Sequence, residues 1–315
     1  MAEPLGPEVI DRLKRFGTVV ELEDSSPNSL INALSDADAL LVRTRSHVTA
    51  RIIDAAPRLR VIGRAGASLD HIDMKAAERR NITVVYTPTV QVVSIAEFTV
   101  AIILATSRRI LWYDRQVRDG QFDTLRTPYG REMRNQTIGL LGGGPVADEV
   151  CRIMREGFHA RVIAHTPETS GPPVDAAEAV DLRTLLRESD VLSIHMPPLE
   201  KFNRMIGAEE LAQMKHTACV INTSRGRVIV NEALAEALKT RQLAGAALDV
   251  FDAEPLPVAH PLRNAPKCIL TPHIAGLTLD VAYGYAGVAD DVIRVLQGES
   301  PQFPAPYRAR GADSD

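Results

Sequence analysis

The chain has 315 residues, of which 45% are hydrophobic and 24% charged, and its formal net charge is −4. A chain of this length is too long to fold around a single small core, so we expect two domains of ordinary globular composition. The sequence has no basic block and no interleaving of aromatic with basic residues, which argues against nucleic acid as a partner. Its longest uncharged apolar stretch, 98–107, is shorter than the roughly 20 residues of a membrane span, so we expect no membrane partner.

Short apolar runs alternate with helical patterns through the first part of the chain. The expected strands cover residues 18–22, 39–42, 59–63 and 82–86. The expected helices cover residues 29–34, 51–55 and 73–79. Such alternation is typical of an α/β fold with a parallel sheet, whose ligands gather at the carboxyl ends of the strands. Arg43, Arg45 and the loop 64–68 stand at such ends.

The pattern at 94–118 predicts one long helix that ends at Gly120 and leads into a second domain. In that domain the expected strands cover residues 138–141, 161–165, 191–194, 219–222, 246–248 and 269–270. The expected helices cover residues 181–188, 232–239 and 278–296, and Gly298 closes the last of them.

A glycine-rich turn separates the first strand of this domain from a helix, in the stretch TIGLLGGGPVADEV (137–150). Gly142 permits the tight turn, and Gly144 lets the backbone approach a phosphate group. Pro145 and Val146 begin the helix, whose N-terminus favours a negative charge. Ordinary glycine-rich turns share this local pattern, but the flanking strand and helix favour a dinucleotide-binding turn.

The three cysteines, Cys151, Cys219 and Cys268, have no metal-ligand or disulfide spacing. They fall in a helix and in two apolar strands, as buried structural thiols do. We therefore expect no metal site and a reducing, cytoplasmic location.

Three polar side chains follow apolar strands of the second domain: Arg225, Glu254 and His273. A guanidinium polarises a carbonyl and grips a neighbouring carboxylate, and an imidazole supplies or accepts the hydroxyl proton. The glutamate raises the pKa of the histidine and orients its ring. Taken singly, each has another interpretation, as a surface ion pair, a turn residue or a strand cap. Their shared place at one sheet edge favours hydride transfer to a carbonyl.

Several long motifs resemble the D-isomer-specific 2-hydroxyacid dehydrogenases over nearly the whole chain. They are RAGASLDHID, TPTVQVVSIAE, GLLGGGPVA, INTSRGRVIVNEAL, ALDVFDAEPLP and TPHIAG. The resemblance implies two Rossmann-like domains, a flavodoxin-like substrate domain (1–97 and 286–315) and an NAD-binding domain (98–285). It also implies that Arg225, Glu254 and His273 are catalytic and that the chain forms a homodimer.

The resemblance assigns further binding residues. For the substrate carboxylate these are the amides of Ala65, Gly66, Ala67 and Ser68. For the nicotinamide end and the border of the cofactor they are Thr223, Ser224, Asp249, His195, Met196 and Pro197. His195 and Asp249 are equally compatible with purely structural roles at strand ends.

Two residues depart from the family pattern in the cofactor site. Pro145 has no N–H, so one phosphate donor is missing, although proline suits the first helical position. Thr166 stands where NAD-using members carry an aspartate that binds the ribose hydroxyls. Because no arginine follows Thr166 to hold a 2′-phosphate, the sequence favours NAD and leaves NADP open.

The substrate is a small 2-keto or 2-hydroxy acid in this interpretation. Arg43, Arg45 and Arg64 suit a phosphate or second carboxylate, and phosphoglycerate dehydrogenases carry arginines matching Arg43 and Arg64. Glyoxylate and hydroxypyruvate are alternatives to 3-phosphoglycerate, and the arginines are also compatible with solvated loop positions.

The alternative function is that of a corepressor-like protein that senses NAD(H), which Pro145 and Thr166 support. Formate oxidation on the same scaffold is a third possibility.

Thr166→Asp tests the cofactor assignment. The added carboxylate should bind the ribose hydroxyls of NADH and repel the 2′-phosphate of NADPH, so NADH binding tightens and NADPH binding weakens. Titration of the variant with both cofactors measures this. Equal loss of both would contradict the assignment.

Overall fold

The computed structural model describes residues 1–43, 45–122 and 130–306, and the chain forms two compact units. Unit 1 is Met1–Gln91 together with the segment from Leu277 onward, and unit 2 is Val92–Gly276. The domain boundaries expected from the sequence, at 98 and 286, both lie further along the chain than those of the structure, at 92 and 277. They differ because Val281 and Tyr285 belong to the core of unit 1, and Ala96 to the core of unit 2.

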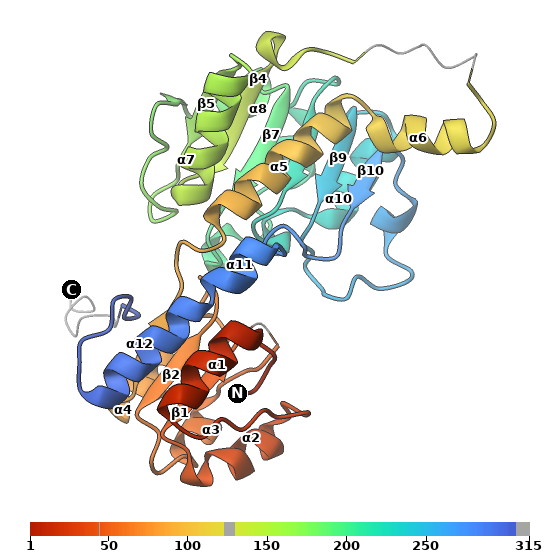
Figure 1. Ribbon diagram of the computed structural model, residues 1–315. Helices are drawn as coiled ribbons and strands as arrows, with labels where there is room; N and C mark the ends of the chain where they lie inside the picture. Colours follow the sequence, from red (N-terminus) through yellow and green to blue (C-terminus); the bar gives the residue numbers. More distant parts are fainter. Residues whose placement is uncertain (44, 123–129, 307–315) are drawn as a thin grey trace. The chain divides into compact units, whose positions relative to one another are not determined.

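Unit 2 is built on one parallel sheet (Figure 1). Its strands are β4 (Thr137–Gly142), β5 (Arg161–His165), β6 (Glu178–Ala179), β7 (Val191–His195), β8 (Cys219–Asn222), β9 (Gly245–Leu248) and β10 (Cys268–Leu270). The strand order is β10-β9-β8-β7-β4-β5-β6. The order reverses where β4 pairs with both β5 and β7, which is where a Rossmann-type sheet binds its ligand.

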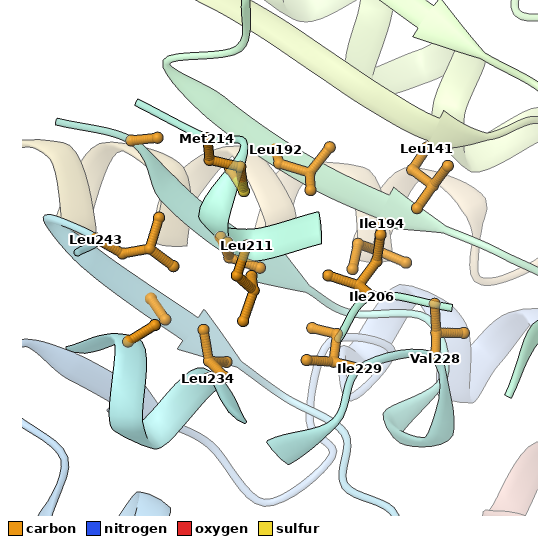
Figure 2. Close-up of a cluster of buried hydrophobic side chains, with 14 of the residues drawn as sticks. Leu141, Leu192, Ile194, Ile206, Leu211, Met214, Val228, Ile229, Leu234 and Leu243 are labelled. Atoms are coloured by element: carbon orange, nitrogen blue, oxygen red, sulfur yellow. The ribbon is translucent and has the colours of Figure 1, made fainter. Parts of the chain in front are cut away.

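Helices cover both faces of this sheet because its strands are apolar on both sides. The helices of unit 2 are α5 (Val92–Ser107), α6 (Ile110–Arg118), α7 (Pro145–Arg152), α8 (Leu182–Glu188), α9 (Ala208–Ala212) and α10 (Asn231–Lys239). On β4, Leu140 packs in a cluster with α5 and α7. Its neighbour Leu141 faces the opposite cluster, with α8, α9 and α10, part of which Figure 2 shows.

Unit 1 has a smaller parallel sheet in the order β1-β2-β3, formed by Ala39–Val42, Val61–Arg64 and Thr83–Tyr86. Its helices are α1 (Pro7–Phe16), α2 (Pro27–Ala33), α3 (Ala50–Asp54), α4 (Met74–Arg79), α11 (Leu279–Gly284) and α12 (Ala286–Gln297). Apolar clusters lie on both faces, one with α2 and α3 and the other with α1 and α12. The predicted α/β class, with two Rossmann-like units, is confirmed.

The strand predicted at 18–22 does not form. Its backbone contacts the first residue of the chain instead, because the Met1 amino group donates to Val20 O (2.6 Å) and Leu22 N–H donates to Met1 O (3.0 Å). Pro4 follows soon after and has no N–H. The possible partner is therefore too short for a ladder.

Two predicted helices are each divided in two. The helix predicted at 94–118 breaks at Arg109, which has a left-handed φ of 53°. Before the break α5 is buried against the sheet, whereas α6 has no buried residue. The helix predicted at 278–296 divides at Tyr285 into α11 and α12, and Gly298 caps it with φ 82° as predicted.

No helix in the described part of the chain is long and apolar enough to cross a membrane.

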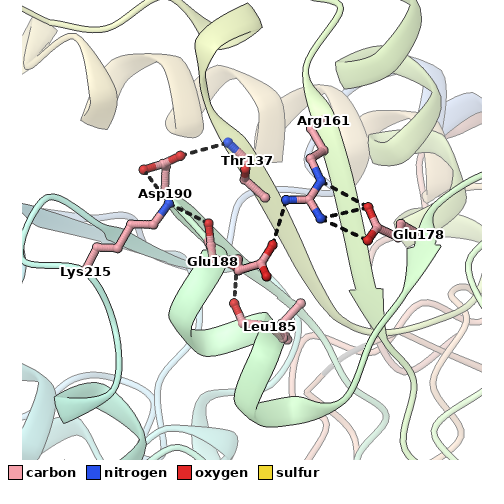
Figure 3. A network of polar contacts seen from close by, with 8 residues as sticks. Thr137, Arg161, Glu178, Leu185, Glu188, Asp190 and Lys215 are labelled. Atoms are coloured by element: carbon pink, nitrogen blue, oxygen red, sulfur yellow. Dashed lines mark hydrogen bonds and ion pairs between the residues drawn. The ribbon is translucent and has the colours of Figure 1, made fainter.

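A polar network ties the amino ends of the strands of unit 2 together (Figure 3). Asp190, which precedes β7, accepts hydrogen bonds from the backbone N–H of Thr137 at 2.9 Å and from Lys215 Nζ at 3.1 Å. Arg161 pairs with Glu178 and Glu188 at the surface nearby. The Asp190 side chain is only 9% exposed. If it were removed, water would replace its hydrogen bonds less readily than those of the exposed members of the network.

Asp190→Ala should destabilise the protein by about 1–3 kcal/mol, because it leaves the Thr137 N–H unpaired in a partly buried setting. Asp114→Ala is the matched control. It removes an exposed ion pair with Arg118 on α6 and should cost about 0.5 kcal/mol or less. Urea unfolding of both variants measures the difference. Equal losses of stability would show that the buried hydrogen bond contributes nothing special.

Candidate active site

The glycine turn forms as predicted at the point where the strand order reverses. Gly142 and Gly144 have φ values of 100° and 97°, a backbone region that side chains other than glycine rarely adopt. Pro145 is the first residue of α7, where its missing N–H costs no helical hydrogen bond. The N–H of Val146 follows at the same helix end, so the turn retains a donor that can face a phosphate.

Thr166 follows β5 directly and borders the same turn. Its hydroxyl lies 3.4 Å from the carbonyl oxygen of Gly142, to which it donates. The position is half-buried and carries no acid. The position after β5 therefore carries a hydroxyl where an aspartate is usual in NAD-binding sheets.

At the end of β7, the imidazole of His195 is buried inside unit 2. His195 is 6% exposed, and its Nε2 lies 2.9 Å from the Ser193 hydroxyl. Burial lowers the pKa of His195 to about 4, so the ring is neutral near pH 7. Met196 is buried as well, and its N–H donates to Ser224 Oγ at 3.4 Å. Pro197 follows.

The loop after β8 carries Thr223, Ser224 and Arg225. Asn222 shapes it, because its Oδ1 accepts the Ser224 N–H at 3.0 Å and its Nδ2 donates to Arg225 O at 2.9 Å. The Thr223 hydroxyl lies 2.8 Å from that of Thr99 on α5. Thr99 is missing from the predicted site, and the only signal for it is a hydroxyl within an apolar helix.

Asp249 holds the loop on which His273 stands. It is fully buried after β9, and its carboxylate accepts the N–H groups of Ile274 (2.9 Å) and Ala275 (2.8 Å) and the Thr271 hydroxyl (2.6 Å). The N–H of His273 donates to Asp249 O at 2.9 Å. This set supports a structural role for a residue that the resemblance places beside the nicotinamide.

Glu254 and His273 form a hydrogen-bonded pair after β9 and β10. Glu254 Oε2 lies 2.8 Å from His273 Nδ1, and Oε1 accepts the Phe251 N–H at 3.0 Å. The bond to Glu254 raises the pKa of His273 against the opposing effect of burial. Burial would raise the pKa of Glu254, but its hydrogen bonds and the charges of His273 and Arg225 together lower it. The three predicted catalytic groups are therefore close enough to interact electrostatically.

The two shifts give this pair a defined pH window. Because the pKa of His273 is raised on folding, its stabilisation is complete below the unfolded pKa and is lost as pH rises through the folded one. Because the pKa of Glu254 is lowered, its stabilisation is present above the unfolded pKa and is lost as pH falls through the folded one. The pair is therefore strongest between the two transitions.

The predicted substrate loop of unit 1 follows β2. The N–H groups of Ala65 and Gly66 already donate inside the unit, to Val42 O at 3.0 Å and to Thr87 Oγ1 at 2.8 Å. Two of the four amides predicted to bind the substrate carboxylate are therefore already engaged within unit 1.

Two arginines stand beside this loop in unit 1. Arg64 is 4% exposed and donates to Ala65 O, and Arg43 lies over the Tyr285 ring with its guanidinium carbon 5.4 Å from the centroid. The Nε atoms of both are buried and have no hydrogen-bond partner among the described residues. Tyr285 is absent from the predicted site, because its spacing in the last helix reads only as part of an apolar face.

Glu232, Asp252 and His260 bring possible metal ligands within 4.8 Å of one another, although the sequence predicts no metal. His260 Nδ1 accepts the Leu262 N–H at 3.2 Å. A neutral imidazole in that state carries its proton on Nε2, which leaves no lone pair there for a metal. The cluster therefore gives little support for a metal centre.

Glu254→Gln should lower the pKa of the His273 imidazole, because a neutral amide no longer favours its protonated form. Titration of the imidazole signals by NMR measures the shift. Glu149→Gln removes a carboxylate that pairs with Arg152 (2.7 Å) instead of a histidine, and should leave the titration of His273 unchanged. An unaltered pKa in Glu254→Gln would refute the coupling.

The chain is similar to known proteins over most of its length. Residues 100–275 match the family model described as the D-isomer specific 2-hydroxyacid dehydrogenase, NAD binding domain. A glyoxylate reductase of Thermofilum pendens is 40% identical over 90% of this chain and 86% of its own length. A D-3-phosphoglycerate dehydrogenase of Archaeoglobus fulgidus is 34% identical over 95% of this chain, which spans 57% of that relative.

The solved structures include an acyclic imino acid reductase in complex with NADPH and D-Arg. It superimposes with a TM-score of 0.86 at 26% identity, and the match covers 96% of both chains. The chain thus belongs to the D-isomer-specific 2-hydroxyacid dehydrogenases, oxidoreductases that act on CH–OH donors with a nicotinamide cofactor, NAD or NADP.

Proposed function

We propose that the chain reduces small 2-keto acids to the corresponding 2-hydroxy acids. Candidate substrates are glyoxylate, hydroxypyruvate and the keto acid that corresponds to 3-phosphoglycerate. The observation that carries this proposal is the Glu254–His273 pair, with Arg225 electrically coupled to both. The pair supplies a protonated imidazole, and the guanidinium supplies a cation for the carbonyl and carboxylate oxygens. The similarity to a glyoxylate reductase supports the same class of substrate.

The residues present fit a nicotinamide cofactor. The turn at Gly142 and Gly144, with the N–H of Val146, suits the pyrophosphate, and Thr166 lies at the ribose edge. Thr223 and Ser224 stand on the loop that also carries Arg225, and would hold the nicotinamide end. When bound, the cofactor supplies or accepts the hydride at C2 of the substrate.

In reduction, Arg225 binds and polarises the keto carbonyl while the protonated His273 gives a proton to its oxygen. His273 Nδ1 is engaged by Glu254, so Nε2 is the nitrogen that delivers the proton. Because the charged imidazole is required, the reduction rate should fall as pH rises through the His273 pKa. The Glu254 carboxylate raises that pKa and so extends reduction toward higher pH.

Arg43 and Arg64 favour a substrate with a second anionic group. Both guanidiniums have a buried Nε without a partner among the described residues, and the amides of Ala67 and Ser68 follow Arg64 on the same loop. A carboxylate on the loop and a phosphate or second carboxylate on the arginines would use these donors.

A panel of 2-keto acids, followed at the nicotinamide absorbance band with NADH and with NADPH, tests the proposal. We expect turnover that falls by about 100-fold or more in Arg225→Gln, since a charged donor to the reacting oxygen is removed. Arg43→Ala should lose activity mainly with the phosphorylated keto acid. Equal activity of wild type and Arg43→Ala on all substrates would remove the second-anion assignment. Cofactor binding without any turnover would favour the NAD(H)-sensing, corepressor-like alternative.

The assembly and location are part of the proposal. Helix α6 exposes Ile110, Leu111 and Val117 at 52%, 52% and 51%, together with Trp112 at 38%. Large apolar side chains exposed to this extent favour a homodimer. Cys151, Cys219 and Cys268 are free thiols, two of them buried, which suits a reducing compartment such as the cytoplasm.

A further inference from the structure

The chain after β5 folds back onto the glycine turn. A Cβ on Gly143 would collide with the carbonyl oxygen of Pro172, and Gly171 is packed against the peptide that joins Gly143 to Gly144. Glycine at 143 thus makes room for the segment 166–173 beside the turn. This segment forms the wall of the site at the end of β5, where the adenosine ribose binds in sheets of this type.

A lysine from the other side of the turn reaches this wall. Lys201 lies on the 3₁₀ helix Glu200–Phe202, which follows β7. Its Nζ donates to Glu168 O at 3.1 Å and lies 4.9 Å from the centroid of the Phe202 ring, which is itself buried. Because β5 and β7 both pair with β4, this contact joins the two loops that flank the glycine turn.

The charges at this edge suit a cofactor with a phosphate on the ribose. An ammonium has three donors, and the bond to Glu168 O uses one of them. Thr166 adds a hydroxyl two residues before Glu168 and brings no negative charge. A 2′-phosphate would gain a cation and a hydroxyl here, whereas the 2′-hydroxyl of NAD would lack its usual carboxylate acceptor.

We propose that Lys201 is a specificity-determining residue that binds the 2′-phosphate of NADPH, with Thr166 as its hydroxyl partner. The inference rests on the proposed function only in that both use the same cofactor site. It reverses the preference for NAD drawn from the sequence, which considers only cations that follow Thr166 in the chain. The cation here comes instead from the β7 loop.

Glu168 places an exposed carboxylate on the same segment. Its charge opposes a 2′-phosphate, and Lys201 offsets that repulsion. Removing the charge in Glu168→Gln should therefore strengthen NADPH binding and leave NADH binding unchanged.

The test measures binding without any keto acid. Wild type and Lys201→Ala are titrated with NADPH and NADH by nicotinamide fluorescence, and with 2′,5′-ADP and 5′-AMP by calorimetry. In Lys201→Ala the Kd for NADPH and for 2′,5′-ADP should rise about tenfold or more, since a charged hydrogen bond is lost. The Kd values for NADH and 5′-AMP should stay within about twofold.

Two controls separate the charge from the fold. Lys201→Arg should retain most of the NADPH affinity, because it keeps the cation. Lys239→Ala, which removes an exposed lysine near Glu236 on α10, should change neither cofactor. An unchanged ratio of NADPH to NADH affinity in Lys201→Ala, or a parallel loss of both, would overturn the proposal. Failure to reduce any keto acid would count against the proposed function and leave these binding constants interpretable.

Discussion

The buried carboxylate of Asp249 is the constraint on which the catalytic edge of unit 2 depends. It binds two backbone N–H groups and one hydroxyl of the segment after β10, and His273 on that segment has a left-handed φ of 57°. A carboxylate excluded from water needs every one of these donors. The requirement fixes the loop, and the loop fixes the direction from which the imidazole meets Glu254.

The parallel sheet determines why the other functional groups gather where they do. Every strand of unit 2 runs in the same direction, so the segments that follow β4, β5, β7, β8, β9 and β10 all emerge at one edge. At the opposite edge, Asp190 and its partners hold the beginnings of the strands. One end of the sheet thus carries structural hydrogen bonds and the other carries the residues assigned to chemistry.

In unit 1 the fold positions the guanidinium of Arg43 for an anionic ligand. Glu3 is buried and accepts backbone N–H groups around Arg43, at 3.1 Å from Arg43 itself and 2.9 Å from Ser46. It therefore shapes the end of β1 through the backbone, and the guanidinium of Arg43 lies against the Tyr285 ring. Its Nε has no hydrogen-bond partner among the described residues, and a cation held in this way against an aromatic face is well suited to an anionic ligand.

Much of this protein was predictable from local sequence. Short stretches of sequence determine the alternation of strands and helices, because periodicity and turn chemistry act over a few residues. They also determine the glycine turn at 142–144 and the strand-end positions of Arg225, Glu254 and His273. Local sequence does not determine the break at Arg109, the unpaired segment 18–22 or the division at Tyr285, since each depends on what the neighbouring element buries. The contacts of Lys201 with Glu168, Arg43 with Tyr285 and Asp249 with residues 271–275 join positions far apart in the chain. Only the packed tertiary structure brings such groups within hydrogen-bonding or ring-contact distance, and so it alone decided their partners.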